Sequence, residues 1–275
     1  MSPPFSCDIS GSNPKVMGIL NLSPDSFYQS SASAMQAMRL AEKMIAEGAE
    51  LLDVGAESTR PGSQAIAVQE EIQLLVPVIR QLCERFAVPV SVDTYKPEVA
   101  ERMLDLGVSL INDIGGLREP SMAPLIARYS AGVVIMHMRG TPATMQVGIH
   151  YDDCLGEVRD FLGKAIQTAE DAGILPERII VDPGIGFGKT LENNLELIAG
   201  LDGLLCLGKP IMLGVSRKSF LGEILDLPVD ERLEGSLAMA AVGVTRGAAI
   251  LRVHDVKETV RVVKAMQALR PFVKE

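Results

Sequence analysis

The sequence predicts an α/β fold: a single closed barrel of eight parallel strands, each followed by a helix, with the active site at the carboxyl ends of the strands. Three observations predict it. Short runs rich in β-branched residues alternate with longer amphipathic stretches throughout the 275 residues. The short runs are continuously apolar, which is typical of parallel strands buried on both faces. No linker rich in Pro, Gly or Ser interrupts the alternation, so residues 1–275 are expected to form one domain.

The apolar runs identify eight strands, which makes a (β/α)8, or TIM, barrel the expected architecture. They cover residues 15–21, 50–55, 88–93, 108–113, 132–137, 178–182, 210–215 and 248–253. Between them, apolar residues recur at helical spacing over 35–45, 68–82, 151–172 and 255–269. Pro97 suits the first turn of a further helix that stops at Gly107. An open doubly wound sheet is the alternative, but the G-x-G-x-x-G segment expected after its first strand is absent.

The composition excludes several classes of protein. Lys and Arg number 26 and Asp and Glu number 35, which gives a net charge of −9. Such an acidic chain lacks the basic face of a general nucleic-acid binder. No apolar run approaches the ~18 residues of a membrane-spanning helix, and the polar first residues do not have the apolar core of a signal peptide. The four cysteines form no CxxC pair, so we expect reduced thiols in a cytoplasmic protein.

Polar residues end nearly every predicted strand, and in a barrel these ends surround one mouth. Asp93, Asn112 and Asp182 end the third, fourth and sixth strands and act mainly as hydrogen-bond acceptors. They suit a ligand edge rich in N–H donors, such as an aminopyrimidine, with Lys218 beside them as a donor to a carbonyl. An all-oxygen site for Mg²⁺ or Ca²⁺ is the alternative interpretation.

Cationic residues follow the seventh and eighth strands. Residues 216–219, with the sequence Ser-Arg-Lys-Ser, open a helix, and Arg252 and His254 follow the eighth strand. The loops after these two strands form the usual phosphate site of the fold, and a helix N-terminus adds backbone donors. The pattern therefore predicts an anionic, phosphorylated substrate.

The glycine-rich segment 182–190 is not a nucleotide-triphosphate loop, because only three residues separate Gly184 from Gly188. Its glycines are expected to let the backbone approach a flat ligand against which Phe187 packs. Three expected loops, 22–32, 56–67 and 138–150, are longer than a connection needs, and long loops at one end of a barrel commonly carry function.

Taken in order, several segments resemble the bacterial dihydropteroate synthases along nearly the whole chain. They are residues 16–21, 24–27, 53–55, 57–62, 91–94, 111–114, 136–142, 145–146, 182–189, 216–219 and 252–256. That family condenses (7,8-dihydropterin-6-yl)methyl diphosphate with 4-aminobenzoate, giving 7,8-dihydropteroate and diphosphate in folate biosynthesis. The resemblance implies this transferase activity, Mg²⁺ as cofactor, a homodimer, and sulfonamides as mimics of aminobenzoate.

The resemblance also implies roles for individual residues. The implied pterin contacts are Asp93, Asn112, Asp182, Lys218, Arg252 and Phe187. The implied aminobenzoate contacts are Phe27, Thr59, Arg60, Pro61, Phe187 and Ser219. The implied diphosphate contacts are Asn21, Arg252 and His254, with Asn21 also a ligand of Mg²⁺. The residues expected to serve catalysis are Arg252, His254, Lys218 and Asp93.

The implied chemistry is dissociative: the C–O bond to diphosphate breaks, and the aminobenzoate nitrogen attacks the methylene cation that the pterin stabilises. One departure concerns the first loop, where the family has Ser-Asp-Gly-Gly and this chain has residues 28–31, Tyr-Gln-Ser-Ser. The missing aspartate at Gln29 is expected to affect turnover rather than the pterin site. Two alternatives share that site: a corrinoid-dependent methyltransferase, which does not need the paired anion-binding segments, and a pterin-binding protein that has lost turnover.

Overall fold

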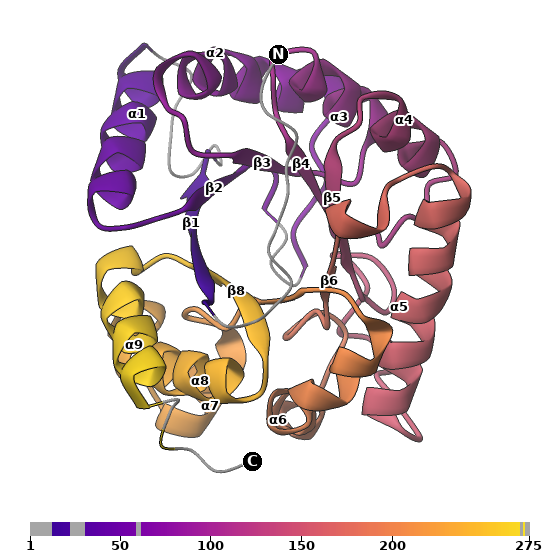
Figure 1. The fold of residues 1–275 in the computed structure, drawn as a ribbon, viewed down its shortest axis with the longest axis vertical. Helices are drawn as coiled ribbons and strands as arrows, with labels where there is room; N and C mark the ends of the chain where they lie inside the picture. The colour runs from indigo at the N-terminus through magenta and orange to yellow at the C-terminus, as the bar shows by residue number, and fades with distance from the viewer. Residues whose placement is uncertain (1–12, 23–30, 59–61, 270–271, 273–275) are drawn as a thin grey trace.

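Eight parallel strands close into a barrel in chain order, and β8 pairs with β1 (Figure 1). The computed structural model describes residues 13–22, 31–58, 62–269 and 272. The strands are β1 (Lys15–Asn21), β2 (Leu51–Gly55), β3 (Val90–Asp93), β4 (Leu110–Asp113), β5 (Gly132–Met136), β6 (Ile179–Asp182), β7 (Ile211–Leu213) and β8 (Ala248–Val253). The predicted fold class and strand order are therefore confirmed.

Helices form a ring around the outside of the barrel (Figure 1). They are α1 (Ser31–Ala46), α2 (Val68–Arg85), α3 (Pro97–Leu104), α4 (Met122–Arg128), α5 (Cys154–Asp171), α6 (Leu191–Ala199), α7 (Ser219–Leu225), α8 (Leu233–Thr245) and α9 (Val256–Leu269). Short 3-10 helices are η1 (Pro176–Arg178), η2 (Leu201–Leu207) and η3 (Val229–Glu231). Within the described part of the chain, no helix combines the length and apolarity that crossing a membrane requires.

Local sequence explains where the helices that border the barrel mouth begin. Pro97 occupies the first turn of α3, as predicted. The side chain of Thr190 caps α6 by accepting from the backbone N–H of Asn193 at 3.2 Å, and Asp153 caps α5 by accepting from that of Gly156 at 2.9 Å. These caps satisfy backbone donors that would otherwise be unpaired, and they fix the direction in which the preceding loops enter the helices.

Two concentric layers of side chains fill the molecule. The strands and helices enclose the larger apolar cluster between them. A second cluster fills the barrel interior with Met17, Leu51, Leu110, Val134, Ile180, Met212 and Ile250. Because side chains alternate along a strand, the residue two positions further on faces inward again, one layer closer to the carboxyl ends. On five of the strands that next inward layer is polar, and it consists of Asp53, Asp93, Asn112, Asp182 and Arg252.

Candidate active site at the barrel mouth

Four of these inward-facing polar residues form one hydrogen-bonded cluster. The guanidinium of Arg252 donates from Nε to Oδ2 of Asp53 at 2.6 Å and from Nη2 to Oδ2 of Asp93 at 2.8 Å. The amide nitrogen of Asn112 donates to the same Oδ2 of Asp53 at 3.0 Å. The structure therefore brings the predicted residues Asp93, Asn112 and Arg252 together.

Asp53 is the member of this cluster that the sequence analysis did not select as a site residue. It is fully buried and accepts from both Arg252 and Asn112. A signal for it existed in the sequence, because Asp53 stands two residues after Leu51 and so shares its inward face. Asp93 and Asn112 pair with each other in the strand register, and Asp53, which pairs with Ser91, lies one inward-facing position earlier.

Three buried oxygen atoms of the cluster have no hydrogen-bond donor among the described residues. They are the Oδ1 atoms of Asp53, Asp93 and Asn112. Leaving a buried acceptor unsatisfied costs about 1–3 kcal/mol, and more when the group is charged. A ligand edge that presents several N–H donors would supply partners to such acceptors, which agrees with the predicted aminopyrimidine edge.

The charge balance of the cluster favours the same kind of ligand. One guanidinium faces two buried carboxylates, so a negative charge remains. Burial raises the pKa of Asp93 to about 7, even though Arg252 acts in the opposite direction. Burial also disfavours the charge of Arg252, but Asp53 and Asp93 outweigh it and raise the pKa of this guanidinium. Arg252 is therefore permanently charged, while Asp93 can change its charge near neutral pH.

The opposite side of the mouth is formed by Asp182, Lys218 and Phe187. Oδ1 of Asp182 accepts from the backbone N–H of Gly184 at 2.7 Å. The ammonium of Lys218 donates to the carbonyl of Ile185 and lies 4.6 Å from the centroid of the Phe187 ring. Burial lowers the pKa of Lys218 to about 8 against the attraction of Asp182, and burial raises the pKa of Asp182 against Lys218. These two oppositely charged side chains and the ring form a second wall for a flat ligand.

At the end of the barrel where an anion is expected to bind, Arg217 is already paired with a carboxylate. Arg217, which the sequence placed among the cations, bonds the carboxylate of Asp255 through Nε at 2.9 Å and Nη2 at 2.6 Å. The exposed His254 lies with Nδ1 3.0 Å from Oγ of Ser216, which also accepts from the backbone N–H of His254 at 3.2 Å. Arg252 points to the interior carboxylates, so its contact with a diphosphate stays a prediction.

Asn21 is exposed at the end of β1, beside the carboxylate cluster. A Cβ added to Gly55 would lie 3.8 Å from both Oδ1 of Asn21 and Oδ2 of Asp93. In the part of the chain that the structure describes, no group of three His, Cys, Asp or Glu side chains could hold a metal ion. Mg²⁺ in phosphate sites takes few protein ligands and completes its shell with phosphate and water oxygens. The amide oxygen of Asn21 fits a site in which the diphosphate supplies further ligands to Mg²⁺. The described residues do not fit a site built from protein ligands alone.

A cleft of about 350 Å³ opens beside the Phe187 turn, where α6 and α7 begin. Its lining includes Gln146, Gly186, Lys189, Asn194, Ser219 and Phe220. Ser219, predicted as an aminobenzoate contact, is exposed at the start of α7. Of the other predicted aminobenzoate contacts, Phe187 lies in the turn beside this cleft, and Phe27, Thr59, Arg60 and Pro61 lie outside the described residues. The departure at Gln29 lies outside them as well.

The chain is similar over nearly its whole length to proteins of known family and structure. Residues 17–254 match the family described as pterin binding enzyme. The dihydropteroate synthase of Escherichia coli K12 is 44% identical over 259 residues, which are 94% of this chain and 92% of that protein. The Yersinia pestis dihydropteroate synthase, solved with a sulfonamide drug, matches with a TM-score of 0.92 at 41% identity over 98% of both chains. The Xanthomonas albilineans enzyme with 4-aminobenzoic acid gives a TM-score of 0.88 at 41% identity, over 98% of this chain and 99% of that one.

Proposed function

The chain belongs to the pterin binding enzymes, as a dihydropteroate synthase, and from that premise we propose how its residues carry out the reaction. It is a transferase of folate biosynthesis that makes 7,8-dihydropteroate from a dihydropterin and 4-aminobenzoate. The single observation that supports the residue assignment best is the set of three buried oxygen acceptors that have no donor among the described residues.

These acceptors orient the pterin. Its amino group and ring N–H groups donate to Asp93 and Asn112, with Asp53 behind them. Asp182 accepts from the opposite part of the same edge, and the nearby ammonium of Lys218 donates to the pterin carbonyl. Phe187 and Arg252 lie at the two faces. The amino group, the N–H groups on this edge and the carbonyl then have partners, which lowers the cost of burying them.

Bond cleavage is dissociative. The C–O bond between the methylene carbon and the diphosphate breaks, and its electron pair leaves with the diphosphate oxygen. The pterin spreads the positive charge of the methylene carbon. The carboxyl groups of Asp93 and Asp182 stabilise that charge in their ionised form, because they lie in a buried, low-dielectric site. The amino nitrogen of 4-aminobenzoate then forms the new C–N bond and loses a proton.

The departing diphosphate is held at the mouth, above the pterin. His254, Ser216 and the backbone at the start of α7 face this end of the barrel. Asn21 would hold Mg²⁺, which supplies positive charge to the diphosphate when it is bound. No side-chain nucleophile takes part, because the two substrates bond directly to each other.

We also propose a homodimer in the cytoplasm. Large apolar side chains are exposed on three helices that contact one another, α6, α7 and α8: Leu195, Ile224, Leu225 and Val242. Burying them against a second copy would remove this surface from water. The thiols of Cys83, Cys154 and Cys206 are unpaired, as expected in a reducing compartment. Light scattering on the purified chain should give about twice the 29.5 kDa of one copy.

The test of the proposed chemistry is to incubate the chain with the pterin diphosphate and Mg²⁺, with and without 4-aminobenzoate. We expect diphosphate and dihydropteroate to appear in equal amounts, and only when aminobenzoate is present. Asn112→Leu, which removes one of the three acceptors, should weaken pterin binding and slow the reaction. Pterin binding without product would support the binding-protein alternative, and diphosphate release without aminobenzoate would contradict the coupling of the two substrates.

A further inference from the structure

The turn that carries Phe187, residues 184–188, is held in place by side chains from several other segments. Gly184, Gly186 and Gly188 all have left-handed φ angles, of 69°, 83° and 65°. This backbone forms no regular ladder, and the four carbonyls of residues 185–188 each accept from a side chain. The donors, in the order of the carbonyls, are Lys218, Gln146 at 3.1 Å, Lys189 at 3.0 Å and Tyr151 at 2.8 Å.

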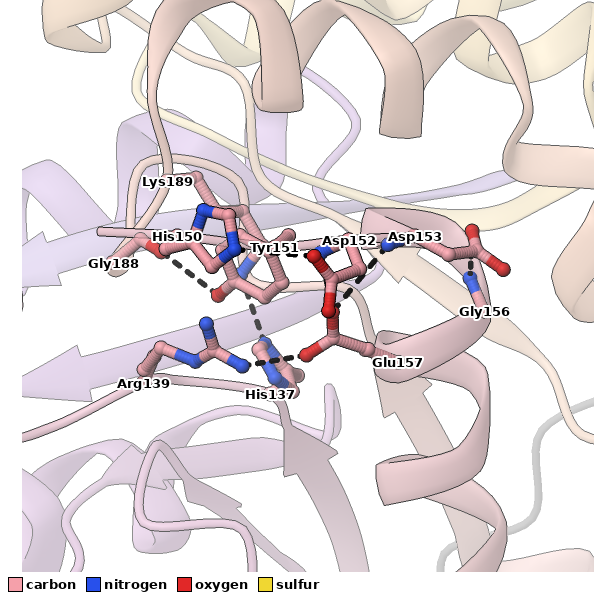
Figure 2. Close-up of polar contacts among 10 residues, drawn as sticks. All are labelled: His137, Arg139, His150, Tyr151, Asp152, Asp153, Gly156, Glu157, Gly188 and Lys189. Carbon is pink, nitrogen blue, oxygen red and sulfur yellow. Dashed lines mark hydrogen bonds and ion pairs between the residues drawn. The ribbon is translucent and has the colours of Figure 1, made fainter.

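Lys189 is the least ordinary of these four donors. Its side chain is 3% exposed, and its ammonium bonds Nδ1 of His137 at 3.0 Å (Figure 2). The same ammonium also donates to the carbonyl of Phe187 at 3.0 Å. Among the described residues it forms no ion pair with a carboxylate, whereas Arg139 nearby pairs with Glu157 at 2.5 Å (Figure 2). A buried cation without a carboxylate is costly, so a residue without a specific task at this place would be better replaced by an apolar one.

The bonds of Lys189 fit both of its protonation states. Burial lowers the pKa of Lys189 to about 7 and that of His137 to about 2, so His137 is neutral and its Nδ1 accepts. The two acceptors take two hydrogens, which is the number that a neutral amine has. The link from β5 through His137 and Lys189 to the Phe187 carbonyl therefore persists whether or not Lys189 is charged.

We propose that Lys189 is a positioning residue for the second substrate. Lys189 holds the carbonyl of Phe187 from the side of His137. Lys218 holds the carbonyl of Ile185 from the side of the pterin site. The Phe187 ring is therefore held at the border between the pterin site and the cleft. The proposal rests on the proposed function, because that function places aminobenzoate against Phe187 and Ser219. Lys189 itself lines the cleft but acts through the backbone of the turn.

The variant Lys189→Met tests the proposal, because it keeps the length of the side chain and removes both hydrogen bonds together with the buried amine. We expect the KM for 4-aminobenzoate to rise about tenfold, as the loss of a positioning hydrogen bond implies. The dissociation constant of the pterin should stay within about twofold whatever happens to the melting temperature, because removal of the buried amine and loss of the donor to His137 and Phe187 act on stability in opposite directions. The backbone amides of residues 184–188 should exchange with deuterium faster than in the unmodified chain.

Tyr151→Phe is the matched control, because it removes only the donor to the next carbonyl along the turn. It should leave the KM for aminobenzoate within about twofold. A Lys189→Met variant with unchanged exchange in 184–188, or with a lower melting temperature and an unchanged KM, would overturn the proposal. The proposed function fails separately, if the unmodified chain makes no dihydropteroate whatever the exchange rates are.

Discussion

Replacing Asp93 by Asn should weaken pterin binding and, at the same time, relieve a cost to stability. The substitution keeps the shape of the side chain and removes its negative charge, while Arg252 keeps Asp53 at 2.6 Å. A pterin donor would then meet a neutral amide in place of a carboxylate. Hydrogen bonds to charged groups contribute about 1.5–3 kcal/mol, so the dissociation constant should rise about 10- to 150-fold.

The effect on stability follows from the raised pKa of Asp93, about 7 in the folded chain against about 3.9 in an unfolded one. A raised carboxyl pKa stabilises the folded state fully below the unfolded pKa, and this stability is lost as the pH rises through the folded pKa. Between pH 5 and pH 8 the unmodified chain should therefore lose about 2–3 kcal/mol through this group. The Asp93→Asn variant has no carboxyl group to ionise at this position and does not lose this stability. Its free energy of unfolding relative to that of the unmodified chain should therefore increase by about 2–3 kcal/mol between pH 5 and pH 8.

Urea unfolding at pH 5 and pH 8, with calorimetric titration of a pterin at pH 8, measures both effects. Asp113→Asn is the control, because burial also raises the pKa of Asp113, to about 6, but its oxygens accept from the backbone N–H groups of Gly115 and Leu117, each at 2.7 Å. It should alter the pH dependence of stability and leave pterin binding within about twofold. Unchanged pterin binding by Asp93→Asn, or equal loss of binding in the control, would refute the reasoning.

Three further predictions concern the mouth of the barrel. Asn21→Leu should weaken Mg²⁺ binding in the presence of diphosphate about tenfold, and calorimetry with Mg²⁺ alone should show no tight site in either protein. Arg217→Gln should lower the melting temperature by about 2 °C, because the bidentate pair with Asp255 is lost. The salt dependence of diphosphate binding should not change, since that charge is already paired. Gly184→Ala should lower the free energy of unfolding, measured with urea, by at least about 1 kcal/mol. The reason is that Gly184 has a φ of 69° and an added Cβ would lie 1.8 Å from the carbonyl oxygen of His137.

The barrel could be predicted from the sequence because each strand is a short apolar run and each helix has one apolar stripe. Asp93, Asn112 and Asp182 could be predicted because they end such runs, and a parallel barrel brings those ends together. Asp53 was within reach of the same reasoning, since the alternation of side chains places it two residues after Leu51.

The partners of the cations could not be predicted in this way. Arg217 adopts a left-handed φ of 56° and pairs with Asp255, 38 residues further along the chain. The contact between Lys189 and His137 joins residues 52 apart and depends on the path of the glycine turn. Such pairings follow from how loops pack in three dimensions, which periodicity does not encode.

A crystal structure of this chain with a bound pterin tests the central claim most directly. We expect pterin N–H groups to lie within about 3.2 Å of Oδ1 of Asp93 and Oδ1 of Asn112, with the ring between Phe187 and Arg252. A pterin bound elsewhere, such as in the cleft beside α6, with those two oxygens still lacking a donor, would contradict it.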